Sequence, residues 1–324
     1  MKRILQLIPF ILFLGLIGPQ SLMAQQDIQF SQYIFNGLSL NPGYAGYRES
    51  LNFTTTYRTQ WTGLTGAPTT VTASLDGVIR DKSIGVGFSI LQDNLGPQST
   101  LTGLGSLAYR LRVNERSRLS FGVSVGFDQY KLDASKLITI SPDLSLAGLI
   151  ADQVRPNLQF GLFYATDRYF VGLSALDLLA NYSNYGPGYF VIRRNRHYYF
   201  HAGALIKLNE SLSLKPSFLI KEDLLAPGNL DINSFLIWHK KFWLGTSLRT
   251  AFNAFNSKAL PSDLKSSDAV SALVEYFPSP YLRIGYSYDY STSHLQEVSG
   301  GSHEISIGYF FHKQRYSMLS PRLF

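Results

Sequence analysis

Histidine side chains are the residues in this chain whose chemistry could most readily serve catalysis or metal binding. The sequence holds six of them: His197, His201, His239, His294, His303 and His312. His197 and His201 are four residues apart, a spacing that would stack the two rings on one face of a helix. In a strand, at about 3.3 Å per residue, the same spacing puts them about 13 Å apart, too far for one metal ion. The secondary structure around them therefore decides whether they could act together.

Motifs that would organise other catalytic chemistry do not occur. The sequence has no Gly-rich phosphate loop, no HExxH zinc motif and no GxSxG nucleophile motif. We therefore expect no catalytic residues, no metal site and no cofactor. A barrel hydrolase that assembles a serine, a histidine and an acid from separate strands stays open as an alternative.

Charged side chains are sparse. They make up 16% of the residues, against about a quarter in an average soluble domain. The formal net charge is +7, but lysine and arginine are scattered along the chain rather than gathered in a stripe. We therefore expect no nucleic-acid partner. The absence of cysteine excludes thiolate metal sites, disulfides and a lipid anchor on the chain itself.

A period of two governs most of the chain. Between Leu119 and Phe127 every odd position is large and apolar, with only Ser or Gly between, and related alternations recur over 282–290 and 303–311. This pattern is typical of a strand with one apolar face and one small, polar face. From Leu51 onward it predicts about fourteen strands, at 51–60, 69–79, 84–91, 99–112, 117–131, 157–165, 169–175, 197–207, 211–222, 231–238, 242–251, 268–276, 281–291 and 302–311.

Connections between these strands alternate in length. The tight ones are 80–83, 113–116, 166–168, 208–210, 239–241 and 277–280, and the others, such as 132–156 and 176–196, are longer. Outer-membrane barrels have this arrangement, with short periplasmic turns, long external loops and an even strand number. We therefore predict an all-β fold, a single antiparallel transmembrane outer-membrane β-barrel of about fourteen strands, with about twelve or sixteen also compatible. A secreted β-sandwich array is the alternative.

Both ends of the chain differ from the barrel. A charged start and an apolar run over Ile4–Ile17 predict a cleaved signal peptide at 1–24. We assign 25–50 to a non-strand leader at the periplasmic side or in the lumen, 51–311 to the barrel, and 312–324 to a periplasmic tail. Both flanking segments are expected to emerge at the tight-turn end, where they could partly fill a wet lumen.

Charged residues at strand positions are expected to face the lumen. An Arg or Lys on the lipid face would cost about 2–4 kcal/mol at the midplane of the bilayer. The predicted lumen charges are Arg58, Asp76, Arg110, Asp128, Arg249, Glu275, Arg283, Asp289 and Glu304.

Ordered motifs in the leader and the first strands resemble one known family. They run from Phe30 to Asn36 (FSQYIFN), from Asn41 to Gly46 (NPGYAG) and from Tyr57 to Trp61 (YRTQW), followed by Gly66-Ala67-Pro68. The chain is similar in these motifs to the PorP/SprF family of Bacteroidetes, in which Ala is usual at the position of Gly43. The likeness continues through Asp93-Asn94-Leu95-Gly96-Pro97 and Tyr169–Ser174.

This resemblance implies an outer-membrane component of the type IX secretion and gliding machinery. Implied partners are outer-membrane lipids, other secretion components, a periplasmic OmpA-like peptidoglycan-binding lipoprotein, and a large surface adhesin held through its C-terminal domain. The implied role is a scaffold or shuttle without catalytic residues; the alternative is a passive channel for a small or apolar solute. The partner-binding residues expected from the family motifs are Phe30, Ser31, Gln32, Tyr33, Phe35, Asn36, Asn41, Pro42, Tyr44, Ala45 and Gly46. Packing of the leader against the inner wall is an equal alternative for their aromatic rings.

Overall fold

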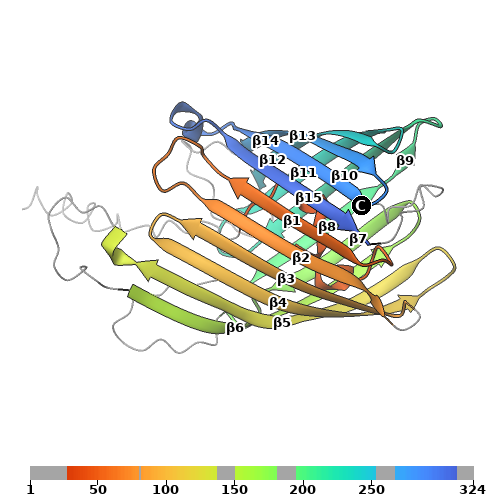
Figure 1. Ribbon diagram of the computed structural model, residues 1–324, viewed down its shortest axis with the longest axis horizontal. Coiled ribbons are helices and arrows are strands. Elements are labelled where there is room, and N and C mark those ends of the chain that lie inside the picture. The colour runs from red at the N-terminus through yellow and green to blue at the C-terminus, as the bar shows by residue number, and fades with distance from the viewer. Residues whose placement is uncertain (1–27, 80–81, 137–149, 181–194, 253–266, 312–324) are drawn as a thin grey trace, which may run out of the picture.

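The computed structural model describes residues 28–79, 82–136, 150–180, 195–252 and 267–311, and in them the chain forms one closed antiparallel barrel (Figure 1). The first and last strands pair with each other over eight residues, from Asn52 opposite Phe310 to Thr59 opposite His303. The segments 197–204 and 206–207 both pair with the strand at 212–222, so they form one strand interrupted at Leu205. Counted in this way, the barrel has 14 strands. The segments are Asn52–Thr59 (β1), Thr69–Ile79 (β2), Ile84–Leu95 (β3), Gln98–Arg112 (β4), Arg118–Asp133 (β5), Ile150–Ala165 (β6), Tyr169–Leu176 (β7), His197–Ala204 (β8), Ile206–Lys207 (β9), Leu212–Glu222 (β10), Gly228–Trp238 (β11), Phe242–Phe252 (β12), Ser267–Ser279 (β13), Leu282–Ser291 (β14) and Ser302–Phe310 (β15).

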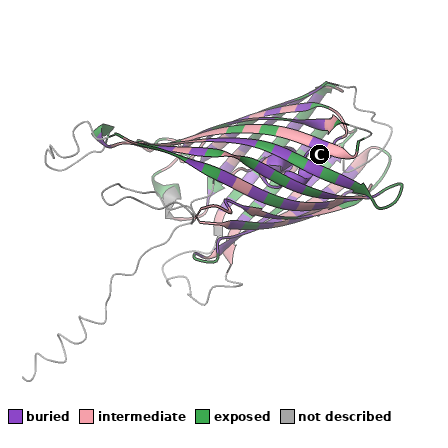
Figure 2. Ribbon diagram, turned by 90° about the horizontal axis from the view of Figure 1, so that it is seen from below, coloured by how far each residue is buried: buried purple, intermediate pink, exposed green. Residues whose placement is uncertain are grey.

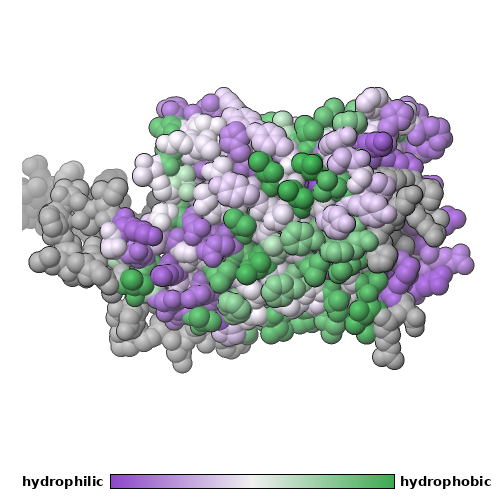
Figure 3. Space-filling model, in the orientation of Figure 1, coloured by the Kyte–Doolittle hydropathy of each residue, from purple (hydrophilic) through white to green (hydrophobic). Residues whose placement is uncertain are grey.

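Side chains alternate between the two faces of the wall. In β5, Val123 and Val125 are exposed on the outside, whereas Ser120 and Ser124 are buried. The same alternation appears as bands of buried and exposed residues along most strands in Figure 2. Hydrophobic residues cover the middle of the visible wall and hydrophilic ones gather toward its ends (Figure 3). This is the surface of a barrel whose outer face meets hydrocarbon.

No helix in the described part of the chain has the length and apolarity needed to cross a membrane. Short 3-10 turns are the only helical elements there, at Tyr33–Phe35 (η1), Gly37–Ser39 (η2), Pro42–Tyr44 (η3), Ala134–Lys136 (η4) and His294–Glu297 (η5).

Strand bounds match the prediction closely, and the two largest differences lie at the long-loop end. β3 extends to Leu95 and β4 begins at Gln98, so the expected loop over 92–98 is a turn at Gly96 and Pro97. Gly96 has a φ of +55°, a left-handed conformation that glycine adopts without strain. β6 begins at Ile150, seven residues before the predicted start, because it stays paired with β5 throughout.

The leader runs through the lumen from one end of the barrel to the other. Ser31 contacts residues of β1, β14 and β15 near the long loops, whereas Glu49 contacts Lys82 beside the tight turn between β2 and β3. The leader joins β1 at the tight-turn end, and its first described residues bind charged groups of the wall at the opposite end.

The core of the molecule lies inside the barrel, where leader and wall side chains pack together. One cluster joins Tyr33, Ile34 and Phe35 to wall residues such as Phe235 and Leu273. A second joins Leu38, Tyr44 and Tyr47 to Ala108 and Phe163. The lumen is thus filled by apolar and aromatic side chains along the leader.

Candidate functional site

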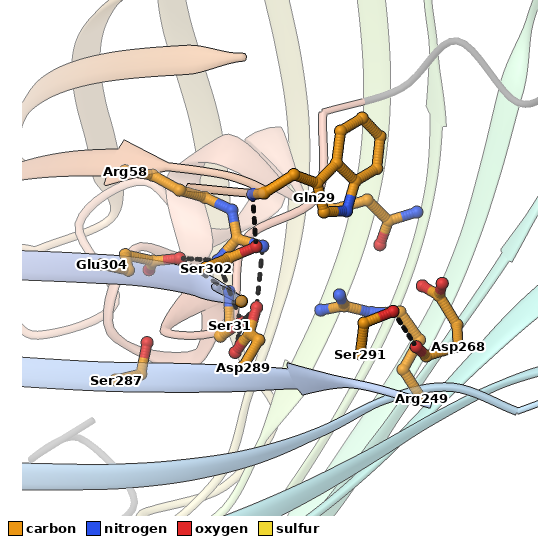
Figure 4. A network of polar contacts seen from close by, with 12 residues as sticks. Gln29, Ser31, Arg58, Arg249, Asp268, Ser287, Asp289, Ser291, Ser302 and Glu304 are labelled. Carbon is orange, nitrogen blue, oxygen red and sulfur yellow. Dashed lines mark hydrogen bonds and ion pairs between the residues drawn. The ribbon is translucent and has the colours of Figure 1, made fainter. Parts of the chain in front are cut away.

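We define the leader site as described residues 28–50 together with the wall groups that hold them at three levels. At the long-loop end, the backbone N–H groups of Ser31 and Gln32 donate to the two carboxylate oxygens of Glu304, each at 2.9 Å. The Ser31 hydroxyl donates to Asp289 at 2.7 Å. The Arg58 guanidinium pairs with Asp289 at 2.7 Å and with Glu304 at 3.0 Å (Figure 4).

Charge balance explains why the leader belongs to this network. Arg58, Asp289 and Glu304 are each no more than 3% exposed, and one guanidinium faces two carboxylates. Buried ions need hydrogen bonds on all sides to offset the cost of desolvation. The N–H groups of Ser31 and Gln32 supply donors to Glu304 that the wall does not, so the leader completes the network. Its members lie on β1, β14 and β15, across the seam that closes the barrel.

Asn41 is the main attachment at the middle level. Its side-chain nitrogen donates to the backbone oxygens of Leu162 at 2.9 Å and Leu173 at 3.1 Å, and its side-chain oxygen accepts from the N–H of Gly43 at 2.8 Å. It therefore caps η3 and fastens that turn to β6 and β7. The wall also donates a hydrogen bond to the leader, from the Ser174 hydroxyl to the Leu40 backbone oxygen at 2.5 Å.

Wall glycines make room for the leader backbone. A Cβ at Gly122 would overlap backbone atoms of Pro42 and Gly43, and one at Gly85 would overlap the Ala45 carbonyl. A Cβ at Gly161 would overlap the Asn41 side chain. At these positions on β3, β5 and β6, only glycine lets the leader lie this close to the wall. Sequence reasoning missed this role, although inward-facing glycines in the strand pattern were its visible signal.

Phe35 attaches the middle of the leader to the part of the wall formed by β11 and β12. Its ring lies 5.7 Å from that of Phe235 and 5.4 Å from that of Trp243, and the Arg283 guanidinium sits 4.5 Å above it. Arg283 is itself paired with Glu275 at 2.6 Å, and both are fully buried. The aromatic cluster therefore packs directly against a buried ion pair.

Glu49 fastens the leader at the tight-turn end. Its carboxylate pairs with Lys82 of the turn before β3 at 3.0 Å, with Arg110 of β4 at 3.3 Å and with Arg118 of β5 at 3.0 Å. Nearby, the Gly46 N–H donates to Asp76 at 3.0 Å. The leader is thus held at both ends as well as in the middle.

The structure places the predicted site residues as follows. Of the eleven leader residues, Phe30 and Asn36 are half-buried and the other nine are buried. All nine predicted lumen charges are buried, and several meet in the networks just described. Partner binding by the leader residues stays a prediction, since their described contacts are with the wall. The predicted signal peptide and tail lie outside the described residues.

Histidines contribute to packing where the structure describes them. His197 and His201 are buried in β8, and His201 lies beside Asn41 at 3.4 Å. Among the described residues, no group of three or more His, Asp or Glu side chains is placed to hold a metal ion.

Known structures share the barrel. The chain is similar to the CymD monoaromatic hydrocarbon channel, with a TM-score of 0.52 and 14% identity over 86% of this chain and 94% of that one. It is also similar to Omp33 of Acinetobacter baumannii, with a TM-score of 0.46 and 8% identity over 81% and 98%. A FadL homologue of Pseudomonas aeruginosa gives 0.45 and 12% over 84% and 93%. At 14% identity, the likeness to the CymD channel shows the fold alone.

Sequence comparison gives the family. No curated protein matches this chain. The family described as type IX secretion system membrane protein PorP/SprF matches residues 22–309, which include the whole barrel except the last residue of β15. The chain therefore belongs to the PorP/SprF family of type IX secretion system membrane proteins, and it is a β-barrel of the bacterial outer membrane.

Proposed function

We propose that this barrel serves type IX secretion as a plugged scaffold, which holds an exported surface protein or docks a periplasmic peptidoglycan-binding lipoprotein. The single observation that supports this role is the leader, which occupies the lumen and is bound to the wall at three levels. A barrel filled in this way presents its loops and turns to partners, rather than an open path to solutes. The family and its barrel fold are non-enzymatic in kind.

The passive-channel alternative requires the leader to leave. Opening a path would break the Glu304 bonds to Ser31 and Gln32 and expose Phe35, which is 1% exposed in the closed barrel. Burying a large apolar side chain stabilises by about 1.5–3 kcal/mol, and the leader buries several. A permanently open state is therefore costly.

Affinity purification tests the scaffold role. The tagged native barrel, extracted in mild detergent from the producing cells, should recover type IX secretion components, and its deletion should abolish export of at least one surface protein. A matched control is an unrelated tagged barrel expressed at the same level. Normal export of every surface protein after deletion, with no secretion component recovered, would exclude the scaffold.

A further inference from the structure

Among the residues that the structure describes, the long-loop end of β6 has a strand on one side only. β5 pairs with the whole of β6, from Asp133 opposite Ile150 to Arg118 opposite Ala165. On the other side, β7 pairs only with the stretch from Phe160 to Ala165. A single further bond, from the Leu178 N–H to the Leu158 oxygen at 2.9 Å, marks the end of that contact. Within the described ranges, residues 150–157 of β6 have no strand on this side.

The free backbone groups can be assigned from the ladder. In an antiparallel strand the N–H and C=O of one residue point to the same side, and the side alternates along the strand. Because the Leu158 oxygen points toward β7, the groups of Pro156, Val154, Asp152 and Ile150 point the same way. Pro156 lacks an N–H, and proline in a sheet is confined to places where no ladder donor is needed. Its position agrees with an open edge here.

This edge lies beyond the hydrocarbon layer. A strand of about 9–11 residues crosses a bilayer, and β6 has 16 residues. Unpaired backbone groups are not tolerated against lipid, so the free stretch belongs in water at the external side. Figure 1 shows β5 and β6 reaching past the neighbouring strands toward η4. Ile150 and Val154 are 56% and 63% exposed there, on the outward face.

We propose that residues 150–156 of β6 bind an extended segment of an exported polypeptide, which adds to the barrel wall as a further strand. A row of backbone donors and acceptors is complementary to another extended backbone, and main-chain bonds of this kind give affinity in strand addition. Ile150 and Val154 supply apolar contacts for alternate side chains of the added strand. The inference rests on the proposed scaffold function and names the element that receives the exported partner.

A proline placed at the edge tests the proposal. Asp152→Pro removes one N–H that points to the free side and leaves pairing with β5 intact, because Ala151 and Gln153 make those bonds. Asp152→Ala is the matched control, since both changes remove the side-chain contact with Gln129 but only proline removes the donor. Val154→Pro is the second variant if Asp152→Pro does not fold, as judged by heat-dependent gel mobility.

Photo-crosslinking reads out the bound strand. The chain has no cysteine, so Ile150→Cys can carry a benzophenone label on intact producing cells, with Val125→Cys in the lipid-facing belt as the control position. We expect a covalent adduct with an exported polypeptide at 150 and not at 125. Loss of one hydrogen bond should weaken that adduct about five-fold in Asp152→Pro relative to Asp152→Ala.

Other outcomes overturn the proposal. An adduct of equal strength in the two variants, an adduct with only this chain or a second copy of it, or no adduct would each exclude strand addition. Recovery of secretion components by the tagged barrel distinguishes failure of the edge proposal from failure of the scaffold function. If the components are recovered and the adduct is equally strong in Asp152→Pro and Asp152→Ala, only the edge proposal fails. If no component is recovered, the scaffold function itself fails.

Discussion

Gly122→Ala should release the leader from the wall. The added Cβ would overlap the backbone of Pro42 and Gly43. Neither backbone can rotate away as a side chain would, so η3 must move off β5. Gly105→Ala is the matched control, because that glycine faces outward on β4 and its nearest neighbour, the Val125 oxygen, is 3.8 Å from the added atom.

The size of the effect follows from the bonds that hold η3. Displacing the turn stretches both hydrogen bonds of the Asn41 side-chain nitrogen, to the oxygens of Leu162 and Leu173. Each such bond contributes about 0.5–1.5 kcal/mol net, so docking weakens by about 1–3 kcal/mol. Since 1.4 kcal/mol corresponds to a factor of ten, the undocked leader should become about 5–150 times more populated.

Hydrogen exchange measured by mass spectrometry can detect this change in the purified barrel. The Tyr44 and Ala45 amides bond to Asn41 and Pro42 within η3, so they exchange when the turn opens. We expect their exchange to accelerate by about 5–150-fold in Gly122→Ala and to stay within about two-fold of native in Gly105→Ala. Equal rates in the two variants would refute the contact between leader and wall on which the argument rests.

Four further changes test the wall, the core and the outer face. Arg58→Met should lower the free energy of unfolding by about 3–5 kcal/mol, because two buried carboxylates lose a shared cation; urea titration with tryptophan fluorescence measures it. Lys82→Met, at a cation whose side chain is 55% exposed, should cost less than about 1 kcal/mol in the same assay, and a similar loss in both would contradict the burial argument. Phe35→Ala should cost about 3–5 kcal/mol by emptying an aromatic cluster, and unchanged leader exchange would count against it. Val123→Arg should cost about 2–4 kcal/mol on the lipid face, seen as a lower folded yield in lipid vesicles; an undiminished yield would place this face away from lipid.

The barrel was predictable because its signal is local. Alternation in a stretch such as Leu119–Phe127 fixes which side chains face out, and tight turns between alternating runs fix the pairing order. The predicted strand 157–165 begins directly after Pro156, a residue type that usually demotes a strand, whereas β6 begins at Ile150. In the fold Pro156 occupies an edge position where its missing N–H has no consequence.

The path of the leader was not predictable from the sequence, for a physical reason. Its attachment at Ser31 and Gln32 uses backbone N–H groups, which every residue except proline carries. The inward direction of Glu304 could be read from strand alternation, but not its partner more than 270 residues earlier in the chain. Likewise, Gly122 appears in the sequence as one small residue among many, and its fit against Pro42 is a property of the closed barrel alone.

Single-channel recording in planar lipid bilayers tests the central claim, that the leader closes this barrel, most directly. The native protein should show no steady conductance, and a variant lacking residues 28–46 should conduct through the emptied lumen. Steady conductance of the native protein, equal to that of the deletion variant, would contradict the account.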